Sequence, residues 1–312
     1  MKSLNSGVEE YLSLRRALGF QMDKNSRILR AFIIFMNNEN KSQITIQLAL
    51  KFAQLPKNVG PNNSSRRLSI VRLFAQYWKA SDPKTEVPPI GLLPCRHYRS
   101  QPYIYKEGEL ERLIAAAEKL KSKRGLRKQT YSTLFGLLVV TGLRISEVIA
   151  INRDTIDLAR GLITIRETKF RKSRLIPLHE STRKKLVEYA FFRDKIYPKS
   201  KIPSFFLSEE GTRLTVWCIR GTFVKLSRQI GIRTLLGRYG HGPRIHDIRH
   251  NFAVKTMIRW YQSGLNVEVH LPLLSTYLGH VHPSDTYWYL SSSPELLGLA
   301  SLRLEKYLGE LS

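Results

Sequence analysis

The segment spanning residues 243–289 constrains this chain most, because side chains that lie far apart along it have the chemistry of a single site. His246 and Arg249 are three residues apart, a spacing that places an imidazole and a guanidinium on the same face of a helix. His280 and Tyr289 follow later and are nine residues apart. The fold therefore has to bring both ends of this segment together.

A helix break is expected between His280 and Tyr289. A continuous helix would turn by about 900° over that interval and leave the two side chains on opposite faces. Pro283 lies between them, and proline interrupts a helix. We expect Ser284 to cap a new short helix, from which Tyr289 can turn back toward the helix that carries His246.

These residue types are suited to binding and attacking a phosphate. A guanidinium grips anionic oxygens with two donors and keeps its charge at any working pH. A tyrosine phenol, whose unperturbed pKa is about 10, becomes a useful nucleophile only where nearby cations stabilise the phenolate. The arginine, the histidines and the tyrosine make half of such a site, so we expect a second arginine and a proton donor elsewhere.

Charge supports a polyanionic partner. The 312 residues include 51 Lys and Arg against 25 Asp and Glu, a formal net charge of +26 that is spread along the sequence. No apolar run approaches the roughly 18 residues of a membrane span, and the N-terminus lacks a signal-like core. Cys95 and Cys218 are too few for a disulfide framework or a zinc cluster, so we expect a reduced, cytoplasmic protein without a membrane partner.

Residues 1–80 predict a small helical bundle, because their apolar residues recur at helical spacing. The last helix, around residues 64–81, combines apolar positions with arginines, so that one face can pack while the other contacts phosphates. We take Arg66, Arg67 and Arg72 as candidate contacts to nucleic acid. A merely solvated basic face is the alternative.

Residues 81–105 are rich in proline and short polar residues and predict an interdomain linker in contact with the second domain. Residues 106–312 then form a larger domain that ends in an amphipathic helix. Within it, residues 162–167 and 174–179 alternate as two strands joined by a basic hairpin. We expect a mainly helical fold with a small β-sheet (α+β), in which an N-terminal helical bundle precedes the mixed domain.

The missing half of the site is found in this second domain. In TGLRISE, Gly142 ends a buried helix, and Arg144 and Glu147 lie three residues apart at the start of the next element. Lys169 and Lys172 lie at or near the tip of the basic hairpin. A lysine on a flexible hairpin suits a proton donor that is delivered into a site.

These motifs carry a family resemblance. TGLRISE, the TKFRKSRLIPL hairpin, HDIRH, and LGH followed by a tyrosine nine residues after its histidine occur in this order. In order and approximate spacing they resemble the signatures of the tyrosine recombinases, also called the phage integrase family. The resemblance extends from about Tyr103 to Leu290. For the N-terminal bundle it depends only on helix pattern and position, where the family keeps its core-binding domain.

The resemblance implies a role for each residue of the site. Arg144 and Arg249 resemble the two catalytic arginines, which clamp the non-bridging oxygens of the scissile phosphate. His246 and His280 look like the two histidine positions, which hydrogen-bond the same oxygens and assist proton transfer. Tyr289 resembles the nucleophile, which forms a 3′-phosphotyrosyl link and leaves a free 5′ hydroxyl.

Two supporting roles also follow from the resemblance. Glu147 matches the family's acidic position, where it orients Arg144 or His246, and a plain charge at a helix start is the alternative. Lys169 resembles the general acid that protonates the leaving 5′ oxygen. Lys172 is the other candidate for that role.

Nearby residues offer further alternatives. Tyr287 lies two residues before Tyr289, about 200° away on a helix, so only one of them can serve. The position after LGH favours Tyr289, with Tyr287 packing against the protein. His250 and His282 are expected to be supporting or surface residues, and Ser291 stands where the family often has another histidine.

As a whole, the resemblance implies an enzyme that cleaves and rejoins DNA strands through a Holliday junction, with no metal, ATP or other cofactor. It implies a homotetramer on two DNA sites, with the helix after Pro294 docking into a neighbouring protomer for oligomerisation. Accessory recombinases or DNA-bending proteins are further partners to consider. The sequences of residues 259–280 and 285–297 resemble those of integrases of transposons and other mobile elements, which favours integration or excision. Chromosome or plasmid dimer resolution is the alternative.

Two alternatives from other classes remain. HDIRH places His246 and His250 at i and i+4, similar to the zinc motif H-E-x-x-H of a zinc-dependent hydrolase. Against it, Asp247 replaces the glutamate, and Arg249 would place a fixed cation beside the metal. The other alternative is a catalytically silent DNA-binding relative, although every chemical position of the motifs is filled.

Overall fold

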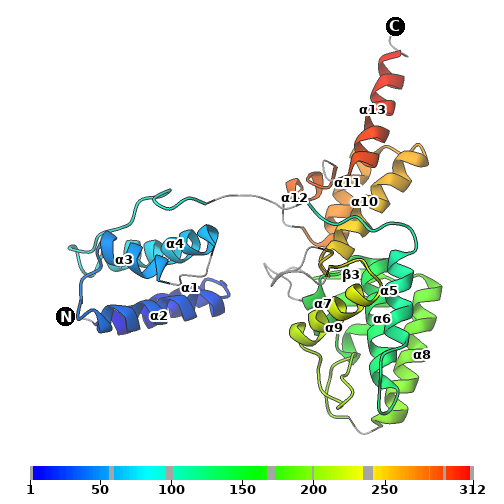
Figure 1. The fold of residues 1–312 in the computed structure, drawn as a ribbon, viewed down its shortest axis with the longest axis horizontal. Helices are drawn as coiled ribbons and strands as arrows, with labels where there is room; N and C mark the ends of the chain where they lie inside the picture. The colour runs from blue at the N-terminus through cyan, green and yellow to red at the C-terminus, as the bar shows by residue number, and fades with distance from the viewer. Residues whose placement is uncertain are drawn as a thin grey trace. The chain divides into compact units, whose positions relative to one another are not determined.

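The protein consists of two compact units, Met1–Ser100 and Gln101–Ser312, drawn in Figure 1. The computed structural model describes residues 3–55, 60–95, 101–166, 173–198, 200–234, 242–280, 282–290 and 293–309. Both units are mainly helical, and the described residues of the second also form one small sheet. The mainly helical fold with a small sheet that the sequence predicts is therefore confirmed.

The first unit is a helical bundle. Its helices are α1 (Leu4–Ala17), α2 (Asp23–Asn38), α3 (Ile46–Gln54) and α4 (Pro61–Trp78). The hydroxyls of Ser3 and Thr45 accept hydrogen bonds from backbone N–H groups in the first turns of α1 and α3. These capping residues determine where the two helices begin. Aromatic rings fill the core, as in the edge-to-face pair of Phe32 and Phe52, whose centroids are 5.1 Å apart.

The segment of residues 81–105 is divided between the two cores. Glu86 belongs to the first unit, because its backbone N–H donates to Ile44 O at 2.9 Å and its carboxylate accepts from Ile46 N at 2.7 Å. Tyr105 is buried in the second unit, where its N–H donates to Asn251 Oδ1 at 3.1 Å. Asn251 lies on the same helix as Arg249, so this anchor ties the entry of the second unit to the site.

The second unit packs helices around a small sheet. Its helices are α5 (Glu109–Glu118), α6 (Leu126–Thr141), α7 (Ile145–Ala150), α8 (Glu180–Ile196), α9 (Val216–Gln229), α10 (Asp247–Gln262), α11 (Val267–Leu278), α12 (Ser284–Tyr287) and α13 (Pro294–Gly309), with a 3₁₀ turn at Arg153–Thr155. The apolar helix α6 lies between α5, α8 and α10, and α13 packs on α10. The site is therefore built on helices that share the core of this unit.

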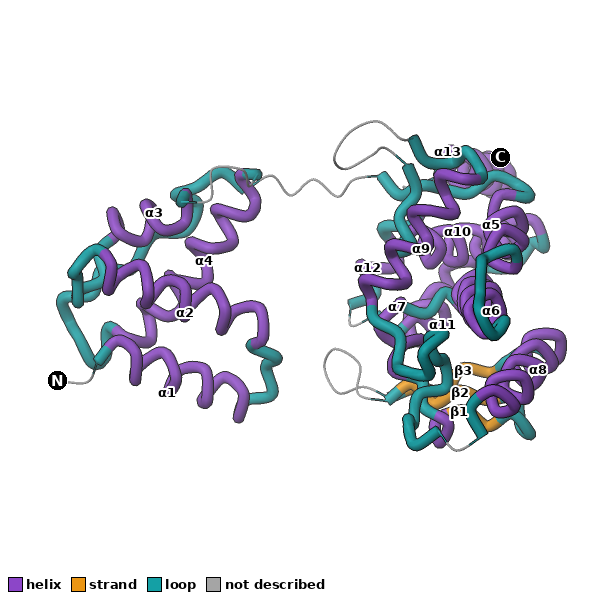
Figure 2. Tube along the Cα trace, turned by 60° about the horizontal axis from the view of Figure 1, so that its bottom comes forward, coloured by secondary structure: helices purple, strands orange, loops and turns teal. Residues whose placement is uncertain are grey.

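The sheet is antiparallel, in the order β1–β2–β3. Figure 2 shows it next to α8. The two predicted strands are confirmed as β2 (Leu162–Ile165) and β3 (Arg174–Pro177), which pair Ile163 with Ile176. β1 (Ile156–Asp157) is a further strand, too short at two residues to give an alternating pattern.

The predicted break at Pro283 is confirmed, because α11 ends at Leu278 and α12 begins at Ser284. The predicted cap is wrong. Ser284 is the first helical residue, and Pro283 occupies the cap position without a side-chain hydrogen bond. Proline suits the start of a helix because its φ is already helical and its missing N–H would have had no partner there.

None of the described helices is both long enough and apolar enough to cross a membrane.

A glycine sets the distance between α1 and α4. A Cβ on Gly7 would lie 2.1 Å from a ring carbon of Trp78, so only glycine lets the two helices approach this closely. We expect Gly7→Ala to lower the free energy of unfolding of the first unit by about 1–2 kcal/mol, because overpacking exceeds the gain in helix propensity. Urea unfolding followed by tryptophan fluorescence and circular dichroism measures this.

Gly136→Ala is the matched control. Gly136 also lies within a helix, but a Cβ there would meet no atom within 4 Å, so this change is expected to leave stability equal or slightly higher. A Gly7→Ala protein as stable as the wild type would contradict the close contact.

Candidate active site

Arginine side chains of the predicted site bind the backbone carbonyls at the carboxyl end of α11. Arg249 donates from Nη2 to Leu278 O at 2.6 Å, and Arg144 donates from Nη2 to Gly279 O at 3.1 Å. Arg249 also donates from Nη1 to Gly142 O at 2.9 Å, where α6 ends. The last carbonyls of a helix have no partner within it and carry the negative end of its dipole, so they bind guanidinium groups well. The helix ends thus hold the two predicted arginines side by side.

Arg249 is buried, with 2% of its surface exposed. Burial, and then the positive charge of Arg144, lower the pKa of Arg249 to about 10, so its guanidinium keeps its charge at neutral pH. Backbone carbonyls compensate this burial only in part, because they carry no full charge. Two adjacent cations held in this way favour an anion between them.

Glu147 lies behind Arg144. Arg144 occupies the cap position of α7, where its N–H and Nη1 donate to the two carboxylate oxygens of Glu147, each at 2.8 Å. Burial by itself raises the pKa of Glu147, but hydrogen bonds and charge from Arg174 and Arg144 outweigh it, so the pKa is below its usual value. Glu147 is therefore ionised, and its carboxylate holds the Arg144 side chain in place.

Arg174 is a neighbour of the site to which the sequence motifs assigned no role. It begins β3 and donates from Nη1 and Nη2 to Glu147 at 3.1 and 2.9 Å. Its Nε donates to Tyr277 O at 2.7 Å, again at the end of α11. The sequence offered one signal for this residue. Arg174 begins a strand of alternating apolar residues, and an arginine that is buried in such a strand needs a negatively charged partner.

The two predicted histidines contribute neutral imidazoles. His280 Nδ1 hydrogen-bonds Thr286 Oγ1 of α12 at 2.7 Å, which fixes its ring. His246 immediately precedes α10 and is partly open to solvent. Crowding by the protein, followed by the charges of Arg249 and Arg144, lowers the pKa of each to about 4. At neutral pH each ring can therefore donate one hydrogen bond and accept a proton.

Tyr289 is buried within the same cluster, with 2% of its surface exposed. Its ring centroid lies 5.3 Å from that of His250 and 5.9 Å from that of His280. Burial raises the pKa of its phenol, while the charge of Arg249 and a hydrogen bond with it act in the opposite direction. In contrast, Tyr287 is 49% exposed, so the prediction that it packs against the protein is wrong.

His250 was expected to be a supporting or surface residue and lies inside the cluster. Its ring contacts His246 at 4.7 Å, Trp288 at 5.2 Å and Tyr289. Its Nδ1 is buried and has no hydrogen-bond partner among the described residues. Burial and the neighbouring His246 lower its pKa to about 3, so it is a neutral ring that packs against Tyr289.

Two further groups of residues were predicted. Lys169 and Lys172 are outside the described residues. In the first unit, Arg66 is exposed, whereas Arg67 donates from Nη2 to Phe52 O at 3.0 Å and stacks its guanidinium 4.0 Å from the Phe52 ring. Arg72 is half-buried on the same helix.

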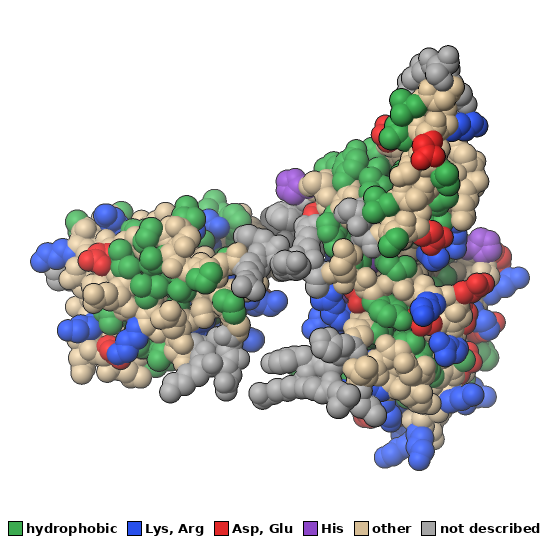
Figure 3. Space-filling view, turned by 45° about the horizontal axis from the view of Figure 1, so that its top comes forward, with side chains coloured by type: hydrophobic (Ala, Val, Ile, Leu, Met, Phe, Trp, Pro, Cys, Tyr) green, Lys and Arg blue, Asp and Glu red, His purple; other side chains and the backbone are tan. Residues whose placement is uncertain are grey.

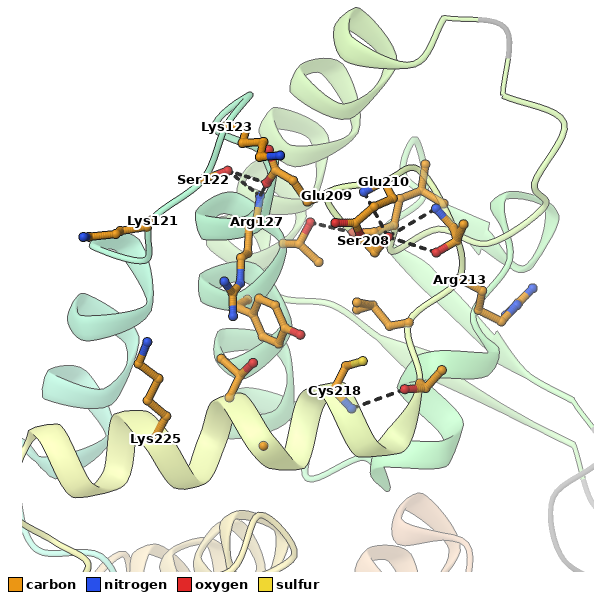
Figure 4. A pocket seen from close by; sticks show the side chains of 18 residues that line it. Lys121, Ser122, Lys123, Arg127, Ser208, Glu209, Glu210, Arg213, Cys218 and Lys225 are labelled. Atoms are coloured by element: carbon orange, nitrogen blue, oxygen red, sulfur yellow. Dashed lines mark hydrogen bonds between the residues drawn. The ribbon is translucent and has the colours of Figure 1, made fainter.

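A cavity of about 860 Å³ in the second unit lies between the loop before α6, the loop before α9 and α9 itself (Figure 4). Its lining contains lysines and arginines but none of the predicted site residues. Glu209 there accepts from Ser122 Oγ at 2.5 Å and from Arg127 N at 2.8 Å, and so caps the start of α6. This contact orders the loops around the cavity.

Metal ligation was the chemical alternative for HDIRH. Within the part of the chain that the structure describes, no group of three or more His, Cys, Asp or Glu side chains could hold a metal ion. His246 and His250 instead pack edge to face, one turn from the buried cation of Arg249.

Comparison with known proteins identifies the family. Residues 104–295 match the model of the phage integrase family. A Sinorhizobium fredii protein named "Putative integrase/recombinase y4rB" is 44% identical over 310 residues, which cover 98% of both chains. The tyrosine recombinase XerC of Chlamydia caviae is 28% identical over 268 residues, 86% of this chain and 74% of that one.

A solved structure shares the fold. The integrase of the transposon Tn1549, in complex with transposon right end DNA, superposes with a TM-score of 0.66 at 15% identity, over 98% of this chain and 99% of that one. The chain belongs to the phage integrase family, the tyrosine recombinases, as its motifs indicated. It is therefore a DNA recombinase by family.

The three histidines predict an acid-sensitive fold. Their folded pKa values of about 4, 3 and 4 for His246, His250 and His280 lie below the ordinary 6.5, so the unfolded chain binds more protons between these limits. The stability they contribute is fully present above pH 6.5 and is lost as the pH falls toward 4. We expect urea unfolding at pH 7 and pH 5 to show a lower free energy of unfolding at pH 5.

His250→Phe removes one of these groups while keeping an aromatic ring against Trp288. We expect this variant to lose less stability between pH 7 and pH 5 than the wild type does. An equal loss in both proteins would mean that His250 takes up its proton in the folded state as readily as in the unfolded state.

Proposed function

We propose that this protein is a site-specific recombinase that cuts DNA with Tyr289 and rejoins it through a 3′-phosphotyrosyl intermediate. The observation that carries the proposal is the contact of Tyr289 with Arg249, a buried cation beside Arg144. A phenol and two guanidiniums held together have the groups that phosphoryl transfer to tyrosine requires.

In the proposed step, the phenolic oxygen of Tyr289 forms a bond to phosphorus and the bond to the 5′ oxygen breaks. The phenolic proton passes to a neutral imidazole, for which we propose His246, and the leaving 5′ oxygen takes a proton from Lys169. The energy of the broken bond is kept in the phosphotyrosyl link. Rejoining reverses the step, so the reaction needs neither ATP nor a metal ion.

The arginines and His280 stabilise the negative charge of the transition state in this scheme. Arg144 and Arg249 bind the non-bridging oxygens, and both are fixed before substrate arrives, so little reorganisation is needed. If Nδ1 of His280 accepts from Thr286, its Nε2–H is left to donate to the same oxygens. Glu147 has the supporting role of holding Arg144.

We further propose double-stranded DNA as the partner of this cytoplasmic enzyme. The net charge of +26 supports this, as do the DNA complexes named for the Tn1549 integrase and for the XerH recombinase bound to difH. In the first unit, Arg66 and Arg72 are proposed to contact DNA phosphates. Arg67 is a weaker candidate, because it already binds α3.

A homotetramer on two DNA sites, exchanging strands through a Holliday junction, is the proposed assembly. Leu297, Leu302, Leu304 and Leu308 of α13 are each about half exposed or more, and apolar side chains are visible on this end of the unit in Figure 3. Such a helix is suited to docking on a neighbouring protomer. Other recombinases or DNA-bending proteins are additional partners to test.

Integration or excision of a mobile element is the proposed biological role. The names of the y4rB relative and of the transposon integrase support it. Similarity to XerC recombinases keeps dimer resolution as the alternative. A catalytically silent DNA binder is less favoured, because Arg144 and Arg249 bind neighbouring carbonyls at the end of α11 and the Tyr289 ring lies 5.9 Å from that of His280.

A covalent adduct tests the chemistry. We expect wild-type protein to form a denaturation-resistant adduct with a nicked suicide DNA that carries the element's own end, in the presence of chelator. Tyr289→Phe should form none, because the nucleophilic oxygen is gone, while still binding the DNA. Denaturing gel electrophoresis of labelled DNA measures both.

Tyr287→Phe is the control, since Tyr287 is 49% exposed and lies two residues away. An adduct that persists in Tyr289→Phe and disappears in Tyr287→Phe would reverse the assignment. If wild-type protein binds the DNA without forming an adduct, the silent relative becomes the better description.

Assembly can be tested on α13. We expect Leu304→Glu with Leu308→Glu to reduce the tetrameric complex on DNA at least tenfold, because buried charge opposes docking. Binding of a single protomer to one half-site should change little. Native gels at rising protein concentration measure both. Phe191→Glu, at an apolar position on α8 that is 75% exposed, is the control that should leave assembly intact.

A further inference from the structure

Arg174 has a contact pattern that the proposed mechanism does not use. Its side chain is 10% exposed, and three of its N–H groups are bound, two by the Glu147 carboxylate and one by Tyr277 O. The first partner lies on α7 and the second at the end of α11. A residue of β3 thus connects the two elements that hold Arg144.

Glu147 is shared by two cations. Arg144 and Arg174 both donate to its two oxygens, and Arg249 is near enough to be influenced by its charge. With Arg174 absent, the buried carboxylate would depend on Arg144 alone for its counter-charge. Arg144 would then be drawn toward Glu147 and away from an anion in the site.

The end of α11 is shaped around Arg174. A Cβ on Gly279 would lie 2.6 Å from Arg174 Nη1, so the guanidinium packs directly against the backbone of Gly279. The carbonyl of that glycine accepts from Arg144. Arg174 is therefore connected to Arg144 by two sets of contacts, one through the Glu147 carboxylate and one through the backbone of Gly279.

We propose that Arg174 is a positioning residue, which supplies the counter-charge of Glu147 and so leaves the guanidinium of Arg144 available to the scissile phosphate. The proposal rests on the proposed function. Arg174 itself does not contact the substrate, because its donors face Glu147 and Tyr277. Of the positive charges around Glu147, those of Arg144 and Arg249 are directed to the phosphate and that of Arg174 balances the carboxylate.

A double-mutant cycle on the full-length protein tests this, with the single-turnover rate of adduct formation on nicked DNA as the readout. We expect Arg174→Met to slow adduct formation on the order of 10- to 100-fold while DNA affinity changes less than about threefold, because misplacing a catalytic group costs rate more than binding. Glu147→Gln in the Arg174→Met background should restore part of the rate, since it removes the carboxylate that competes for Arg144.

The pH profile separates positioning from a merely structural role. Without Arg174, burial should raise the pKa of Glu147, so that Glu147 takes up a proton as the pH drops from 7.5 to 5.5. The protonated carboxyl no longer competes for Arg144, so adduct formation by Arg174→Met should fall less steeply than that of the wild type over this range. The double variant has no carboxylate at this position and should lack this relief, so its rate should vary with pH as that of the wild type does. This comparison also serves if Arg174→Met is poorly folded, because the double variant buries no unbalanced charge.

Arg193→Met is the matched control. Arg193 is 3% exposed, donates to Asp194 at 2.8 and 2.9 Å and to Phe205 O at 2.7 Å, and lies on α8 outside the site. Its loss should lower stability without changing the rate of folded protein. Effects of Arg174→Met and Glu147→Gln that multiply in the double variant, or an unaltered pH profile, would overturn the proposal. Failure of the wild type to form any adduct would instead reject the proposed function.

Discussion

The site depends on one physical interaction, the binding of arginine side chains to the unpaired carbonyls at the carboxyl end of α11. Tyr277, Leu278 and Gly279 accept from Arg174, Arg249 and Arg144 in turn, and these arginines come from a strand and two further helices. Each guanidinium satisfies a carbonyl that the helix leaves without a partner. A helix end that holds cations can present them to a phosphate, because their charge is only partly neutralised there.

Charge and burial set the protonation states of the other residues of the site. Glu147 is ionised and contacts two guanidiniums, so it can orient them. His250 and His280 are kept neutral by partial burial and by neighbouring positive charge, and His246 by crowding and the charges of Arg249 and Arg144. A neutral histidine can receive a proton at physiological pH, and a buried phenol stays protonated until substrate arrives. The histidines and Tyr289 are thus uncharged, and the arginines outnumber the one ionised carboxylate, Glu147, which favours binding of an anion before any proton moves.

Much of this could be predicted from sequence. The helices of both units, strands β2 and β3, the end of α6 at Gly142 and the break at Pro283 follow from local patterns, because caps, alternation and proline act over a few residues. The family followed from the order of the motifs. The predictions that Ser284 caps a helix and that Tyr287 packs against the protein were wrong. If a helix begins one residue earlier or later, different side chains face inward, and local propensity does not fix the residue at which it begins.

The sequence by itself determined which chemistry is present, since the types and spacing of Arg144, His246, Arg249, His280 and Tyr289 fix the available donors, acceptors and nucleophile. Only the tertiary structure decided what those groups bind. That Arg174 shares Glu147 with Arg144, and that His250 lies against Tyr289, depends on contacts between elements far apart along the chain. No spacing rule reaches across such distances, because the packing of the core, and not local geometry, sets how β3, α7, α10 and α11 meet.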